Sequence, residues 1–166
     1  MTTATTNTTD KTKITDNTKT TDHRSLLSVN DEAMVVVEPA EDVRKHTVVD
    51  RDGLEIGKVD DLLVDEEAHK VRFLQIKEGG FLGMGGRRFL VPVDAIARID
   101  GDTVHVDQKG EHVGAGPTYD PAIATEEAWR GKAFGDGGYF EGLYGHYGYD
   151  PFWTPGYAYP GGLFYR

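Results

Sequence analysis

Two arginines that follow a glycine-rich segment are the first residues that suggest binding chemistry. The segment runs from Gly79 to Gly86 and is followed by Arg87 and Arg88. Backbone amides and two guanidinium groups that converge on one point can bind an anion. Dinucleotide-binding loops and P-loops also need a helix after the glycines, which this sequence does not predict. We therefore interpret the segment as a hairpin connection, with an anion site at Arg87 and Arg88 as the alternative.

Carboxylates are concentrated between residues 60 and 67, and they are the hard oxygen ligands that Ca²⁺ or Mg²⁺ prefers. Their spacing is not that of an EF-hand, and alternation along a strand would divide them between two faces. We therefore expect solvated carboxylates at a strand end rather than a metal site. The residues are Asp60, Asp61, Asp65, Glu66 and Glu67.

Histidine, serine and cysteine chemistry has little support in the sequence. His105 and His112 flank Asp107, but we expect the first on the outer face of a strand and the second in a polar loop. Ser25 and Ser28 both precede the folded part, where no scaffold would hold a nucleophile. Cysteine is absent, which removes disulfides, thiolate zinc sites and cysteine nucleophiles. We expect neither an enzyme nor a cofactor.

Charge and hydropathy restrict the partners. The net charge of -10 disfavours contact with nucleic-acid phosphates and with anionic membrane surfaces. No apolar run reaches the roughly 18 residues of a membrane helix, and the N-terminus lacks the basic and apolar regions of a signal peptide. We therefore expect a cytoplasmic protein without membrane insertion.

Short β-rich runs between residues 47 and 106 predict the elements that would position these groups. Gly53 suits a tight turn, the loss of alternation at Asp60 and Asp61 indicates a β-bulge, and Pro92 should end a strand because it cannot donate to a ladder. Since no long helix is predicted, the pattern favours a mainly β fold, a small β-barrel of five to six short strands. The predicted strands are Thr47–Val49, Ile56–Asp65, Val71–Ile76, Arg88–Val91, Ala95–Ile99 and Thr103–Val106.

Composition changes sharply along the chain and divides it into five segments. The first is expected to be disordered because it has too few apolar side chains to offset the entropy of ordering. Ala33–Val37 is a candidate edge strand or docking segment, and Pro121–Ala133 is a candidate short helix. In order, the segments are a disordered Thr-rich tail (1–30), a linker or docking segment (31–43), the barrel (44–110), a second linker (111–138) and an aromatic tail (139–166).

The tail is crowded with aromatic residues, Gly and Pro. Such rings must be buried against the barrel of the same chain or against a partner or second subunit, and the sequence leaves both open. Stacking on single-stranded nucleic acid would need positive charge that the tail lacks. Binding energy would concentrate in large apolar groups of Gly-rich segments. The candidate partner-binding residues are therefore Phe81, Leu82, Tyr147, Trp153 and Tyr157.

The barrel resembles a PRC-barrel domain in two stretches, V-V-D-R-D-G-L-E-I-G-K-V-D-D-L-L-V-D at 48–65 and R-R-F-L-V-P-V-D-A-I-A-R-I-D-G-D-T-V-H-V-D at 87–107. In the first stretch, Gly57 would allow a close backbone approach. The tail motifs T-Y-D-P at 118–121 and Y-G-H-Y-G-Y-D-P-F-W at 144–153 are similar to segments that follow the barrel in stand-alone members. The resemblance implies a partner-binding module, as in the cytoplasmic part of the photosynthetic reaction-centre H subunit and the C-terminal part of the ribosome maturation factor.

Together these observations predict a non-enzymatic adaptor of the PRC-barrel type that binds a protein partner through its barrel surface and its aromatic tail. We expect a homodimer without a cofactor or metal, and no nucleic-acid partner is favoured. Two alternatives stay open. One is a barrel that binds a small anionic ligand through the loop from Gly79 to Arg88. The other is a ribosome- or RNA-associated factor, which rests only on the relatives and conflicts with the acidic charge.

Overall fold

The computed structural model describes residues 26–30, 39–79, 86–120 and 138–161. These residues form seven strands in one curled sheet of order β5-β4-β3-β2-β7-β6, and β1 pairs with β3 outside this path. The predicted mainly β class is confirmed. The strands are β1 (Leu26–Ser28), β2 (Thr47–Val49), β3 (Glu55–Asp65), β4 (Lys70–Glu78), β5 (Arg88–Pro92), β6 (Ile96–Asp100) and β7 (Thr103–Val106). The helices are α1 (Gly110–Ala115) and α3 (Tyr139–Tyr147), with 3-10 turns η1 (Pro39–Glu41) and η3 (Val93–Ala95).

The turn and bulge signals in the sequence predicted the positions of the strands correctly. The pairing of β3 with β4 shifts register between Val59 and Asp61, which confirms the predicted bulge, and β5 ends at Pro92. Gly57 lies where β3 and β4 approach closely. A Cβ atom there would lie 2.3 Å from the carbonyl oxygen of Lys77, so the position requires glycine.

Strand β1 corrects the boundary of the predicted disordered tail. Its three residues pair antiparallel with the end of β3, Leu26 opposite Asp65 and Ser28 opposite Leu63. The prediction that the whole of 1–30 is disordered is therefore wrong for residues 26–30, because Leu26 is buried against the sheet. The other two predicted flanking elements, Ala33–Val37 and Pro121–Ala133, lie outside the described residues.

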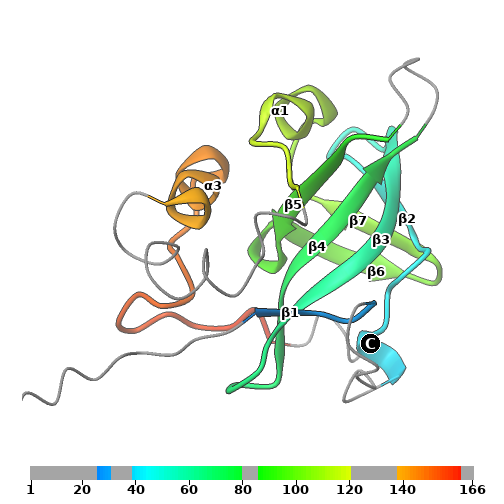
Figure 1. Cartoon of the computed structure of the whole chain (residues 1–166). Helices are drawn as coiled ribbons and strands as arrows, with labels where there is room; N and C mark the ends of the chain where they lie inside the picture. Colours follow the sequence, from blue (N-terminus) through cyan, green and yellow to red (C-terminus); the bar gives the residue numbers. More distant parts are fainter. Residues whose placement is uncertain (1–25, 31–38, 80–85, 121–137, 162–166) are drawn as a thin grey trace, which may run out of the picture.

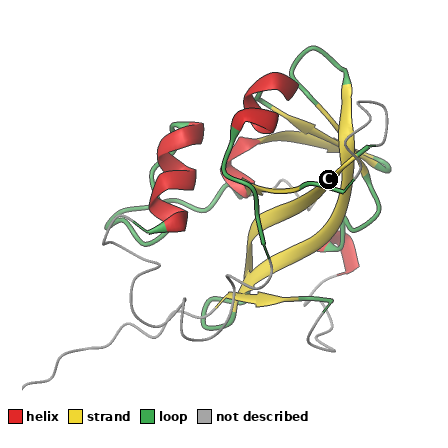
Figure 2. Cartoon of the chain, turned by 45° about the horizontal axis from the view of Figure 1, so that its top comes forward, coloured by secondary structure: helices red, strands yellow, loops and turns green. Residues whose placement is uncertain are grey.

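Both views show α1 and α3 side by side at the β5 edge of the sheet (Figures 1 and 2). Helix α3 buries Phe140, Leu143, Tyr144 and Tyr147, which follow the i, i+3, i+4, i+7 spacing of an amphipathic helix. It ends at Gly148, which has a left-handed φ of 75° and donates its N–H to the carbonyl of Tyr144.

The described part of the aromatic tail, residues 139–161, packs in cis. Phe73 of β4 lies 5.2 Å from Phe140, 5.5 Å from Tyr144 and 6.4 Å from Phe152, measured between ring centroids. In β4, the six consecutive residues Val71–Ile76 are all buried. Since neighbouring side chains of a strand point to opposite faces, both faces of β4 are covered. The tail covers one face, and the curl of the sheet encloses the other.

Candidate functional site

A groove of about 1100 Å³ opens at the end of the sheet where α1 lies. One wall is the turn from β2 into β3, the other is α1, and the ends of β4 and β5 form the floor. In Figure 1 this end of the sheet is opposite the turn that joins β3 to β4. The described apolar side chains of the lining are Leu54, Ile56, Ile76, Phe89, Val113 and Ala115.

Asp50 holds the two walls of this groove together. Its Oδ1 accepts hydrogen bonds from the backbone N–H groups of Asp52 and Leu54, both at 2.9 Å, and its Oδ2 accepts from the N–H of Gly110 at 3.1 Å. The first two bonds shape the turn, and the third satisfies a free amide at the start of α1. Burial raises the pKa of Asp50, but the backbone donors outweigh it and lower the pKa below its usual value.

The rim of the groove is exposed and acidic. Leu54, with 66% of its surface accessible, is the one large exposed hydrophobic side chain among the described residues. The exposed carboxylates are those of Asp52 on the turn, Glu55 at the start of β3 and Glu111 on α1, and none has an ion pair with another described residue. Lys109 is an exposed cation of the lining, and Arg51, which is paired with Asp107, lies next to Asp52. This combination is an apolar surface with unbalanced negative charge.

The two arginines of the predicted anion site are both engaged with carboxylates of the chain. Arg87 makes a two-pronged contact with Glu78, at 3.0 and 3.1 Å, and Arg88 Nε lies 3.1 Å from Oδ2 of Asp60. An anionic ligand would have to displace these partners. The structure therefore brings Arg87 to the groove as part of an ion pair, and Arg88 to a separate pair on the sheet. Phe81 and Leu82, the predicted binding residues between these strands, lie outside the described residues.

The acidic segment does not form a solvated strand end as predicted. Glu66 and Glu67 are exposed, but Asp61 and Asp65 retain only 4% and 3% of their accessible surface. Asp65 forms a buried ion pair with Arg72, Oδ2 to Nη2 at 2.9 Å. The prediction is wrong for the two buried residues because strand β1 covers them. Within the described part of the chain, no group of three or more His, Asp and Glu side chains is placed to hold a metal ion.

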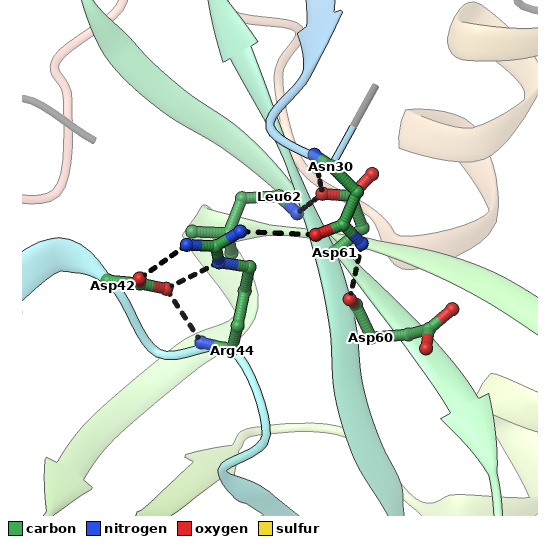
Figure 3. Close-up of polar contacts among 6 residues, drawn as sticks. All are labelled: Asn30, Asp42, Arg44, Asp60, Asp61 and Leu62. Atoms are coloured by element: carbon green, nitrogen blue, oxygen red, sulfur yellow. Dashed lines mark hydrogen bonds and ion pairs between the residues drawn. The ribbon is translucent and has the colours of Figure 1, made fainter. Parts of the chain in front are cut away.

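Asp61 anchors the chain that follows β1 to the bulge of β3 (Figure 3). Its Oδ1 accepts from the N–H groups of Asn30 at 3.1 Å and Leu62 at 2.8 Å. Arg44 then donates to the side-chain oxygen of Asn30 at 3.1 Å and to Asp42 at 2.7 and 2.8 Å. The hydrogen bond from Arg44 lowers the pKa of Asp42 below its usual value. These partners are internal, so the network is structural.

The sequence of the folded part also matches a known family. The family model of the PRC-barrel domain matches residues 36–113, which include β2 to β7 and the first turn of α1. This part of the chain is a PRC-barrel domain. The resemblance seen in the stretches 48–65 and 87–107 is thereby confirmed. No curated protein matches the chain. None of the helices in the described residues is both long and apolar enough to span a bilayer.

Three predicted partner-binding residues of the tail pack against the PRC barrel. Tyr147 retains 5% of its accessible surface, and Trp153 is half-buried with its ring 5.5 Å from that of Tyr144. The Tyr157 hydroxyl donates to Asp94 at 2.8 Å. Burial raises the pKa of both Tyr157 and Asp94. Each of these three aromatic side chains therefore has contacts within the chain, and their role in binding a partner stays a prediction.

Two histidines connect α1 of the PRC barrel to α3 of the tail. The rings of His112 and His146 stack at 4.1 Å with an interplanar angle of 10°. His112 Nε2 donates to the carbonyl of His146 at 2.9 Å, and His146 Nε2 donates to the carbonyl of His112 at 2.8 Å. The prediction of His112 in a polar loop is wrong, because it lies in α1. His105 lies on β7, with Nε2 3.4 Å from Asp100. No sequence spacing relates the stacked pair, and only the fold reveals it.

Proposed function

We propose that the chain is a non-enzymatic module that binds a protein partner through the groove at the α1 end of its PRC barrel. The observation that supports this proposal is the exposed Leu54 at the rim of an open groove with an apolar floor. Covering a side chain of this size is worth about 1.5–3 kcal/mol. A single exposed leucine is ordinary, but Leu54 is continuous with the apolar lining of the groove, and contiguous apolar surface rimmed by polar groups is typical of protein interaction sites.

The groove suits a protein segment better than a small ligand. Sites for small molecules are enclosed and place a few polar groups to fix the ligand. Here Asp50 is engaged with backbone amides and Glu78 with Arg87, so the polar groups of the floor serve the fold. The tail, expected to contribute to binding, is assigned instead to the stability of the barrel because Phe140, Tyr144, Tyr147 and Phe152 are buried in cis.

Site-specific photo-crosslinking tests this function. A benzoylphenylalanine introduced at Leu54 is expected to crosslink one protein in cells that express the full chain. The same residue at Ala97, which is exposed in the edge strand β6, serves as the control and should not crosslink that protein. Absence of a crosslinked species at position 54, or equal crosslinking from both positions, would refute the groove as the binding surface. The homodimer stays a prediction, which light scattering on the full chain measures.

A further inference from the structure

We infer that the partner segment bound in this groove is basic, with cations on both sides of an apolar side chain. This inference rests on the proposed function, since it specifies the occupant of the same groove. The described lining contains five acidic residues and two basic ones. The acidic residues are Asp50, Asp52, Glu55, Glu78 and Glu111, and the basic residues are Arg87 and Lys109.

The charges that face a partner are even less balanced than this count. Glu78 and Arg87 neutralise each other as an ion pair. The carboxylate of Asp50 is buried and satisfied by three backbone amides. Within the described lining, the carboxylates of Asp52, Glu55 and Glu111 face solvent beside the ammonium group of Lys109. The neighbouring Arg51 is paired with Asp107, and Lys58 and Lys77 line an adjoining pocket that shares Glu55. Like charges that share a rim repel one another, and a cationic partner would relieve the repulsion.

The positions of the carboxylates define the pattern of the partner. Asp52 lies on the turn between β2 and β3 and Glu55 is the first residue of β3, both on one wall, whereas Glu111 lies on α1, on the other wall. Leu54 and the half-buried Ile56 lie on the turn side of the apolar floor. A bound segment would cover these two residues with an apolar side chain. To form ion pairs with the carboxylates on both walls, it must therefore carry a cation on each side of that side chain.

A second copy of this chain is a poorer occupant. The net charge of -10 means that a copy approaches an acidic rim with an overall repulsive charge. A basic segment from another protein gains the charge attraction and the apolar contact together. Its association should therefore weaken as the salt concentration rises, because exposed charges are screened.

Fluorescence anisotropy with two defined peptides tests the inference. The probe is a labelled peptide that alternates Leu and Lys, and its counterpart alternates Leu and Glu. We expect the full chain to bind the Lys peptide and not the Glu peptide. The double substitution Glu55→Lys, Glu111→Lys should lower the affinity for the Lys peptide by about tenfold or more. It should also raise the affinity for the Glu peptide.

Two control variants separate the groove from general attraction to an acidic protein. Glu67→Lys makes the same charge change as Glu55→Lys or Glu111→Lys alone, but at the exposed turn after β3, at the far end of the strand from the groove. It should change the affinity by less than about twofold, since that distance exceeds a Debye length. Leu54→Ser keeps every charge and should still weaken binding. If Glu67→Lys weakens binding as much as Glu55→Lys or Glu111→Lys alone does, non-specific attraction explains the signal and the inference is wrong.

The crosslinking experiment distinguishes failure of this inference from failure of the proposed function. If Leu54 crosslinks a partner through a segment without basic residues, the groove binds protein but the basic partner is refuted. If the crosslinked species is a second copy and light scattering shows a dimer that Leu54→Ser dissociates, the groove is a subunit interface and the inference falls. If neither peptide binds and no crosslink forms, both proposals fall.

Discussion

Asp50→Asn is the substitution that most directly tests how the groove is built. The carboxylate joins the turn to α1 through three backbone amides, those of Asp52, Leu54 and Gly110. The Asn oxygen can still accept the two bonds in the turn, but without a charge. The Asn amide group would point its own donor at the N–H of Gly110. One bond is therefore lost, and two are weakened.

The expected cost follows from the strength of hydrogen bonds to charged groups, about 1.5–3 kcal/mol each, against about 0.5–1.5 kcal/mol for neutral ones. Relief from burying a charge offsets part of the loss. We expect the free energy of unfolding at pH 7 to fall by about 2–3 kcal/mol in Asp50→Asn. Asp52→Asn, on the exposed neighbour, is the control and should stay within about 0.5 kcal/mol of the parent protein.

The pH dependence gives the decisive readout. Burial raises the pKa of Asp50, but the backbone amides lower it below the value of an unfolded chain. The ionised group therefore stabilises the fold above the unfolded pKa of about 3.9, and this contribution is lost as pH falls through the lower folded pKa. Urea titrations from pH 7 to pH 3 should show the difference between parent and Asp50→Asn shrinking at the acid end. A difference that is constant with pH would refute the role of the charge.

Further substitutions at four positions test the packing. Gly57→Ala should lower the free energy of unfolding by about 3 kcal/mol or more in urea titrations, since its Cβ would meet the Lys77 carbonyl oxygen; a near-parental midpoint would contradict this. Tyr147→Ala should cost about 3–5 kcal/mol. Tyr147→Phe should stay within about 1 kcal/mol of the parent, because the buried hydroxyl has no hydrogen-bond partner among the described residues. In a double-mutant cycle, His112→Ala and His146→Ala should couple by about 1–2 kcal/mol, and additive costs would show that the stacked pair is not a unit.

The strands of the barrel were predictable because their signals are local. A turn glycine, a break in alternation and a proline each act within a few residues. The structure has the predicted turn at Gly53, the bulge at Asp61 and the strand end at Pro92. Strand β1 has no such signal, since its three residues depend on a partner more than thirty residues away. The parallel pairing of β2 with β7 is also non-local, so periodicity could not reveal it.

Helix α3 was missed although its spacing is visible in the sequence. Phe140, Leu143, Tyr144 and Tyr147 follow a helical period, but Gly142 and Gly145 lie between them and lower the helical propensity. Packing against the barrel overrides that propensity, as tertiary contacts commonly do. The groove could not be predicted from a sequence motif. It is formed by a turn, two strand ends and a short helix, and none of these elements has a distinctive sequence by itself.

The cis packing of the tail changes how assembly of this protein has to be measured. A barrel of about 70 residues buries little more than half of the surface of its unfolded chain and is marginal alone. Here Phe140, Tyr144 and Phe152 complete its core by covering Phe73. A chain ending at residue 120 would expose Phe73 and is expected to associate through that bared face. The mass of this shortened chain would then reflect the exposure of Phe73 and not a native interface. The oligomeric state must therefore be measured on the full chain, with substitutions at exposed Leu54 as the probe of a native interface.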